Sequence, residues 1–170
     1  MLKEIQIRRS VRKYRDEQIP TDKLESLLRA AMQAPSARNC QPWEFVVITQ
    51  RALLKKIPEF HPYSKMVPNA GAAILVCGNT RLQSEPGYIV QDCSAAVQNL
   101  LLEAVHQNLG AVWLGVYPRE ERMKGMTELF DLPEHIIPVA LISIGVPAEV
   151  PEPEDRFRKE KIHFQEWGRA

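Results

Sequence analysis

The sequence lacks the features that would set it apart from ordinary globular proteins. Cysteine is scarce: its three residues form no CxxC pair, and an odd number leaves one thiol unpaired, which predicts reduced thiols in a cytoplasmic protein. No apolar run approaches the roughly 20 residues that a membrane-spanning helix needs. The first residues contain no signal-peptide core. We therefore expect a soluble cytoplasmic protein with no membrane partner.

An excess of one charge is missing as well. The chain carries 22 basic and 21 acidic residues, a net charge of +1, whereas proteins that bind nucleic acid over a broad surface are usually more basic. The basic residues nevertheless gather at the two ends, within residues 1–15 and 156–161. A nucleic-acid-binding domain that uses the basic N-terminal residues is one candidate class. The balanced charge and the lack of an aromatic-rich binding motif disfavour it, so we expect no nucleic-acid partner.

Several catalytic motifs are also absent. The sequence has no strand–GxGxxG–helix unit for a dinucleotide, no GxxxxGK[ST] for a nucleotide phosphate and no GxSxG for a nucleophilic serine. Its four histidines and three cysteines show no metal-ligand spacing such as HxxxH. These absences predict no metal site and no side chain that acts as a nucleophile.

What the sequence does contain is an alternation of helical and strand patterns. Its 170 residues predict one domain, 1–170, with a C-terminal arm from about residue 151. Periodicity predicts helices over residues 21–34, 51–57, 91–107 and 119–130, and strands over 45–48, 72–77, 111–116 and 139–144. Such alternation predicts a layered α/β sandwich. Asp92, at the start of the third helix, is expected to cap that helix or to interact with its dipole.

The N-terminal segment RRSVRKY, residues 8–14, contains three arginines and a serine. Arg8, Arg9 and Arg12 offer planar forks of hydrogen-bond donors, and Ser10 adds a hydroxyl. Such a set can surround a phosphate group. A solvated basic arm is the alternative interpretation, since runs of basic residues are common.

Two further segments place polar or small residues at the ends of elements. Residues 35–43, PSARNCQPW, supply Ser, Asn and Gln, whose neutral hydrogen-bonding groups suit the edge of a flat heterocycle. A polar turn with an aromatic plug is the alternative. Gly115, at the end of a strand, would let a flat ligand approach the backbone. An ordinary strand end before a turn is the alternative there.

The last segment, residues 156–167 with the sequence RFRKEKIHFQEW, combines basic and aromatic residues. Terminal segments usually fray. The rings of Phe157, Phe164 and Trp167 predict instead that this segment docks, either on its own domain or on a partner subunit.

The order of these segments resembles the FMN-dependent nitroreductase family over nearly the whole chain. The resemblance is carried by RRSVRKY at 8–14, APSARNCQPW at 34–43, DCSAAVQNLLL at 92–102, GAVWLGVYP at 110–118 and KIHFQEW at 161–167. It implies an α+β fold, a three-layer α/β/α sandwich around a mixed, largely antiparallel sheet. It also implies a homodimer with FMN at the interface and termini that embrace the partner subunit.

The resemblance further implies roles for individual residues. Those that would hold the FMN phosphate and ribityl chain are Arg8, Arg9, Ser10 and Arg12, with Arg156 or Lys161 of the arm closing the phosphate site. Those that would line the isoalloxazine ring from the neighbouring subunit are Pro35, Ser36, Ala37 and Asn39, with Gln41 close by. Those that would lie near the other side of the ring are Leu114, Gly115 and Val116.

The activity that the resemblance implies is that of an FMN-dependent NAD(P)H oxidoreductase. NADH or NADPH would pass a hydride to flavin N5, and a small electron acceptor, a nitroaromatic or a quinone, would then take the electrons in a ping-pong cycle. The flavin carries this chemistry, so no catalytic side chain is expected. A flavin-binding or sensing module without significant turnover is the alternative.

Overall fold

The structure, a computed structural model, describes residues 1–168 of the chain. At its centre is a four-stranded sheet in the order β1 (Trp43–Ile48), β2 (Ala72–Asn79), β4 (Ile136–Gly145) and β3 (Gly110–Gly115). All three strand pairs are antiparallel. An isolated parallel bridge between Ser10 and Ala111 lies beside β3, so the backbone pairing is mixed although largely antiparallel.

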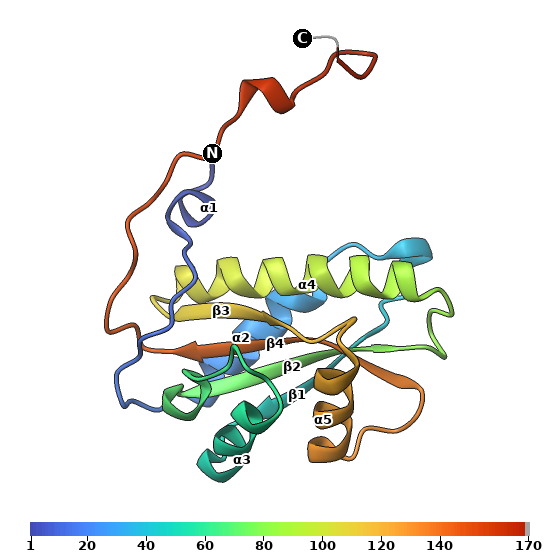
Figure 1. Cartoon of the computed structure of the whole chain (residues 1–170). Coiled ribbons are helices and arrows are strands. Elements are labelled where there is room, and N and C mark those ends of the chain that lie inside the picture. The colour runs from blue at the N-terminus through green and yellow to red at the C-terminus, as the bar shows by residue number, and fades with distance from the viewer. Residues whose placement is uncertain (169–170) are drawn as a thin grey trace.

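Helices cover both faces of the sheet (Figure 1). One face packs against α2 (Thr21–Met32) and α4 (Pro86–His106), and the other against α3 (Arg51–Lys56) and α5 (Glu120–Phe130). The shorter helical elements are α1 (Lys3–Ile7), η1 (Ala37–Asn39), η2 (Ile57–Glu59), η3 (Val67–Asn69) and η4 (Lys159–Lys161). This arrangement confirms the predicted three-layer α+β sandwich. Within residues 1–168, no helix is both long and apolar enough to cross a membrane.

Apolar side chains form a separate core on each face of the sheet. Along β2, Ile74 and Val76 belong to the core beneath α2 and α4, whereas Leu75 and Cys77 belong to the core beneath α3 and α5. A strand that is buried on both faces has a continuous apolar sequence without alternation. The sequence therefore predicts the buried strand correctly but does not distinguish its two faces.

The eight predicted elements are all present, and the largest shift concerns the start of α4. This helix begins at Pro86 rather than at residue 91, and proline suits the first helical turn. The shift corrects the prediction for Asp92, which is neither a cap nor a first-turn residue. Asp92 is a buried residue well inside α4, and its Oδ1 accepts a hydrogen bond from the backbone N–H of Ala37 at 3.0 Å.

The two ends of the chain are placed differently. Residues 8–15 lie along the sheet and its helices, and the backbone N–H of Arg15 donates to the carbonyl oxygen of Val146 at 2.9 Å. The C-terminal arm, residues 151–168, extends away from the sheet and its helices (Figure 1). Phe157, Phe164 and Trp167 of the arm are all exposed. The aromatic rings do not dock on their own body, so docking on a partner subunit stays the prediction.

Candidate functional site

The N-terminal basic segment lies along the outer edge of β3. Ser10 forms the parallel bridge with Ala111, and the backbone N–H of Val11 donates to the Ala111 carbonyl oxygen at 3.0 Å. Val11 is buried, and a Cβ placed on Gly110 would lie 2.7 Å from its side chain. Since Val11 anchors the segment, the side chains on either side of it are held at the protein surface.

Three arginines gather where this segment meets the arm. Arg9 donates from Nε to the carbonyl oxygen of Glu152 at 2.9 Å and from Nη2 to that of Glu154 at 3.2 Å. Partial burial, and then the neighbouring positive charges of Arg156 and Arg9, lower the pKa of Arg8. In residues 1–168, no carboxylate forms an ion pair with Arg8 or Arg9, whereas Arg156 pairs with Glu154 at 3.3 Å. A phosphate dianion beside Arg8 would offset the positive charges that lower its pKa.

A cavity of about 610 Å³ opens at the end of β3 and brings together three predicted site residues, Arg12, Leu114 and Gly115. Its remaining lining residues come from the loop before η3, from β3 and from α5: His61, Pro62, Tyr63, Lys65, Met66, Trp113 and Arg122. Among residues 1–168, the lining includes the cationic side chains of Arg12, Lys65 and Arg122 and no carboxylate. This lining favours an anionic or electron-rich ligand.

Gly115 is the point where the backbone faces this cavity. A Cβ on Gly115 would meet no atom within 4 Å, so a flat ring can lie against the backbone there. The Gly115 carbonyl oxygen accepts hydrogen bonds from Nε2 of His61 at 3.1 Å and from Nη1 of Arg122 at 2.8 Å. The first contact assigns the proton of the neutral imidazole to Nε2. Burial lowers the pKa of His61, so the ring stays neutral and holds the strand end.

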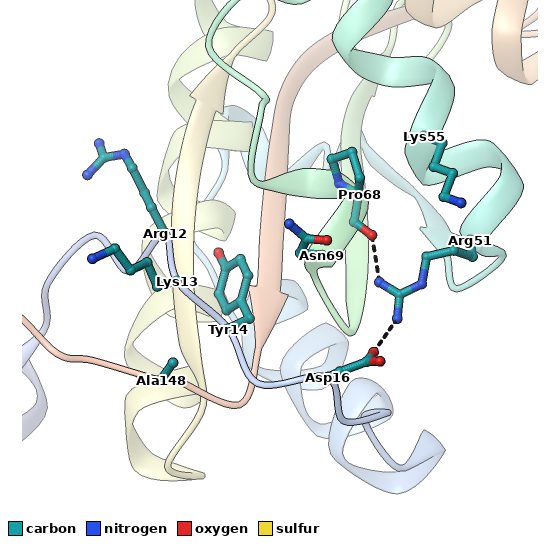
Figure 2. Close-up of a pocket in the computed structure, with 9 residues that line it drawn as sticks. All are labelled: Arg12, Lys13, Tyr14, Asp16, Arg51, Lys55, Pro68, Asn69 and Ala148. Carbon is teal, nitrogen blue, oxygen red and sulfur yellow. Dashed lines mark hydrogen bonds and ion pairs between the residues drawn. The ribbon is translucent and has the colours of Figure 1, made fainter.

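A second cavity, of about 630 Å³, also contacts Arg12 (Figure 2). It lies between the N-terminal segment around Tyr14 and helix α3, which carries Arg51. Arg51 pairs there with Asp16 at 2.9 Å and so ties α3 to the N-terminal segment. Arg12 is the one predicted site residue that lines this cavity. We therefore place the candidate site in the cavity at Gly115.

The polar loop over residues 35–41 is shaped by its own hydrogen bonds. Oγ of Ser36 accepts from the backbone N–H of Gln41 at 2.9 Å, and Nε2 of Gln41 donates to Oδ1 of Asn39 at 3.1 Å. Asn39 and Gln41 have φ angles of 56° and 48°, in the left-handed region. The bond from Ala37 to Asp92 fixes the loop to α4. These hydrogen bonds therefore hold the loop in a defined conformation.

This loop does not meet the basic segment within one chain. Pro35, Asn39 and Gln41 are exposed, and Ser36 and Ala37 are half-buried. None of the five lines either of the two cavities that contact Arg12. Their assignment to the flavin of a neighbouring subunit stays a prediction.

The remaining predicted residues are placed as follows. Arg156 lies close enough to Arg8 to lower its pKa, whereas Lys161 is farther along the arm in η4. No described contact joins Lys161 to Arg8. Val116 is fully buried behind Gly115, where its backbone N–H donates to Val139, and it lines neither cavity.

Seven residues of the cavity at Gly115 are outside the predicted site, and the four that matter most for its polarity are His61, Tyr63, Lys65 and Arg122. The first three lie in a segment without helical or strand periodicity, and Arg122 lies on a helix of mixed polarity. No local pattern indicates that these two segments meet. They meet because η2, η3 and α5 pack on the same face of the sheet.

Comparisons with known proteins agree with this fold. A model of the Nitroreductase family matches residues 5–64 and 61–146. A protein of Methanothermobacter thermautotrophicus, provisionally named NADH dehydrogenase/NAD(P)H nitroreductase, is 48% identical over 167 residues, which cover 98% of this chain and 87% of the relative. A crystal structure from Parabacteroides distasonis with the same provisional name has a TM-score of 0.92 at 40% identity and covers 96% of both chains.

A third relative was solved with a ligand. The structure of a provisionally named nitroreductase from Desulfovibrio desulfuricans, in complex with FMN, has a TM-score of 0.82 at 30% identity. The match covers 94% of this chain and 92% of that one.

Fold and site together define a class, the three-layer α+β proteins with a cationic cavity at the end of an outer strand. Within this class, the chain belongs to the nitroreductase family. The names of its relatives also confirm the predicted enzyme class, an NAD(P)H-dependent oxidoreductase.

Proposed function

We propose that this chain is an FMN-dependent NAD(P)H oxidoreductase that reduces small planar acceptors, nitroaromatics or quinones, in a ping-pong cycle. The cavity at Gly115 is the observation that carries the proposal. It combines an open backbone edge for a flat ring with cationic side chains from three separate elements. The relative solved in complex with FMN supports the choice of flavin.

The residues present fit the two ends of FMN. Arg8 and Arg156 would hold the phosphate, which carries about two negative charges, and the hydroxyl of Ser10 lies near Arg8 in sequence. Arg9, whose three guanidinium nitrogens already donate to backbone carbonyl oxygens, would add its positive charge. Arg12 and Lys65 line the cavity at Gly115, where their positive charges would stabilise an electron-rich ring. Bound FMN would supply the redox chemistry, since its ring can take electrons from NADH or NADPH and give them to the acceptor.

The chain itself contributes binding and orientation. His61 and Arg122 both hold the Gly115 carbonyl oxygen, so the strand end keeps one position against a flat ring. Because burial lowers the pKa of His61, its neutral ring acts through Gly115 rather than as an acid. Donor and acceptor would bind in turn in the same cavity, which is the geometry that a ping-pong cycle needs.

The proposal includes a homodimer. In the arm, Phe157, Phe164 and Trp167 are 67%, 58% and 91% exposed, and a second copy of the chain would cover them. The polar loop 35–41, already formed by its own hydrogen bonds, would then contact the flavin of the other subunit. Each FMN site would be completed by residues of both chains.

An absorption spectrum of the purified protein under nitrogen, before and after addition of NADH or NADPH, tests the function. We expect a bound-flavin spectrum that bleaches with a reduced nucleotide and returns when a nitroaromatic is added. A flavin that stays oxidised with both nucleotides would favour the binding module without turnover. A colourless protein that binds no added FMN would reject the site at Arg8, Ser10 and Arg12.

Substitution of Arg12 tests the cofactor site. We expect Arg12→Ala to weaken FMN binding about 10- to 100-fold, because a hydrogen bond from the charged guanidinium of Arg12 to the flavin would contribute roughly 1.5–3 kcal/mol. Flavin fluorescence titration of the apoprotein measures the dissociation constant. Lys13→Ala is the matched control, since Lys13 is the next residue, pairs with Glu149 at 2.9 Å and does not line the cavity at Gly115. Equal affinities for Arg12→Ala and the parent would remove Arg12 from the site.

A further inference from the structure

Arg122 of α5 is held in the cavity at Gly115 by two contacts. Its Nη1 donates to the Gly115 carbonyl oxygen at 2.8 Å, and its guanidinium carbon lies 5.2 Å from the centre of the Tyr63 ring. A hydrogen bond and a cation–π contact together restrict the orientation of a planar group. Arg122 as a residue is half-buried, and these two contacts orient its guanidinium before any ligand binds.

Arg51, in the neighbouring cavity, shows an arginine whose donors are largely used by the protein. It donates to the carbonyl oxygens of Pro68 and Ala70 at 2.6 and 3.1 Å and pairs with Asp16 at 2.9 Å (Figure 2). Arg122 makes one such hydrogen bond. Across residues 1–168, no carboxylate oxygen lies within 4.0 Å of its guanidinium nitrogens. A guanidinium has five N–H donors, so Arg122 retains donors for a ligand.

The surroundings of Arg122 favour a planar anion. Tyr63 and Trp113 line the same cavity and are 69% and 36% exposed, so both present aromatic surface to a ligand. Arg12 and Lys65 add positive potential, and no carboxylate of the described part of the chain lines the cavity. A negative charge on an entering ring would therefore gain attraction without competing with a protein carboxylate.

We propose that Arg122 recognises an anionic group on the ligand that enters this cavity, either a carboxylate of the electron acceptor or the 2′-phosphate of NADPH. Both groups accept paired N–H···O hydrogen bonds from a guanidinium. This assignment rests on the proposed function, since it takes the cavity at Gly115 as the place where donor and acceptor bind. Arg12 and Lys65 serve the flavin in that proposal, whereas Arg122 reaches the cavity from α5 and selects the second ligand.

The test compares ligands that differ by a charged group, in the wild type and in R122Q. One arm measures kcat/KM for 4-nitrobenzoate and 4-nitrobenzamide with NADH, and the other measures kcat/KM for NADPH and NADH with 4-nitrobenzamide. In each arm we compare kcat/KM for the ligand with the additional charged group, 4-nitrobenzoate or NADPH, with kcat/KM for the ligand that lacks it. We expect R122Q to lower this ratio about five- to tenfold in one or both arms, as for a partly exposed charge-assisted hydrogen bond. A change in the acceptor arm identifies a carboxylate, and a change in the donor arm identifies the 2′-phosphate.

Two further variants keep the test specific. R122K retains the positive charge, should lower the ratio less, and provides the same comparison if R122Q fails to hold flavin. K124Q removes one positive charge from the same helix, where Lys124 pairs with Glu128 at 3.8 Å and does not line this cavity, so both ratios should stay unchanged. Calorimetric titration of the oxidised protein with 4-nitrobenzoate measures binding without turnover, and we expect Kd to rise with the loss in the acceptor arm.

Two kinds of result would overturn the role of Arg122. The first is an R122Q protein with wild-type flavin content and unchanged ratios in both arms. The second is an equal loss of kcat/KM for the ligands with and without the additional charged group, because Arg122 would then only support the Gly115 carbonyl. A wild-type protein that binds no flavin, or that does not oxidise NADH and NADPH, would instead reject the proposed function. The two failures are therefore distinguishable.

Discussion

The two basic ends of this chain resemble each other in composition and differ in structure. Each end combines arginines and lysines with a few apolar or aromatic residues. In the N-terminal segment, Val11 is 4% exposed and Tyr14 lies against the backbone of Gly145. In the arm, Trp167 is 91% exposed. The same kind of sequence is therefore anchored at one end and extended at the other.

The difference arises from the contacts that each segment makes with the rest of its own chain. The N-terminal segment donates backbone hydrogen bonds to the carbonyl oxygens of Ala111 and Val146 and buries Val11 against Gly110. The chain that leads into the arm leaves the N-terminal segment after Ala148, whose backbone N–H donates to the carbonyl oxygen of Lys13. A basic segment joins a site in its own chain when its apolar residues reach the core. Otherwise, as we propose for the arm, a second chain has to supply the contact surface.

Removal of the aromatic rings of the arm should have the largest effect on this comparison. We expect the triple substitution of Phe157, Phe164 and Trp167 by serine to dissociate the dimer and release FMN. Each ring buried in an interface contributes roughly 2–3 kcal/mol, so the dimer dissociation constant should rise more than about a hundredfold. Sedimentation velocity and flavin content measure both effects. Val47→Ser, at an exposed site on β1, is the control, and an unchanged dimer in the triple variant would contradict the role of the arm.

A smaller effect is expected where the N-terminal segment is anchored. In Gly110→Ala, the new Cβ would lie 2.7 Å from Cγ1 of Val11, so the segment must move away from β3. Overpacking of this kind costs about 1–3 kcal/mol. FMN affinity should fall as well, because Arg8 and Arg12 move with the segment. Urea denaturation and flavin titration measure the two losses.

Gly87→Ala is the matched control for this substitution. A Cβ on Gly87 meets nothing within 4 Å, and Gly87 lies in the first turn of α4. Alanine favours a helix over glycine by up to about 1 kcal/mol, so this variant should be as stable as the parent or slightly more stable. A Gly110→Ala protein as stable as Gly87→Ala would show that the segment is not anchored at Val11.

The smallest expected effect concerns the hydroxyl of Tyr14, which lies 2.8 Å from the Val11 carbonyl oxygen and 3.1 Å from that of Ser143 and donates to them. Tyr14→Phe should lower the free energy of unfolding by about 1 kcal/mol at pH 8. Tyr88→Phe, at an exposed site, should change nothing. Equal stabilities of the parent and Tyr14→Phe would show that the hydroxyl does not secure the segment.

The contribution of Tyr14 should also depend on pH. Burial raises the pKa of Tyr14 to about 12, above its usual value of about 10 in an unfolded chain. The unfolded state therefore loses its proton first, and stability falls as the pH rises from about 10 to about 12. Denaturation curves at pH 8, 10 and 11 should show the advantage of the parent over Tyr14→Phe shrinking across this range. A constant difference would contradict the shifted pKa.

Local sequence patterns predict much of the fold because these helices and strands are encoded by residues that are neighbours along the chain. The continuous apolar run at 72–77 predicts β2, and the apolar face from Ala96 to Val105 predicts the body of α4. The first turns of α4 are missed because residues 86–90 lack helical periodicity of their own. Asp92 was misjudged for the same reason, since its partner, the N–H of Ala37, lies far away in the sequence.

The sequence by itself determined the elements, the basic and polar segments and, through the order of its blocks, the resemblance to the nitroreductase family. These properties depend on residues that are neighbours along the chain. Only the tertiary structure decided that Lys65 and Arg122 join Arg12 and Gly115 in one cavity, and that the polar loop 35–41 does not. The physical reason is that η3 and α5 pack on one face of the sheet, which brings together side chains that share no sequence pattern.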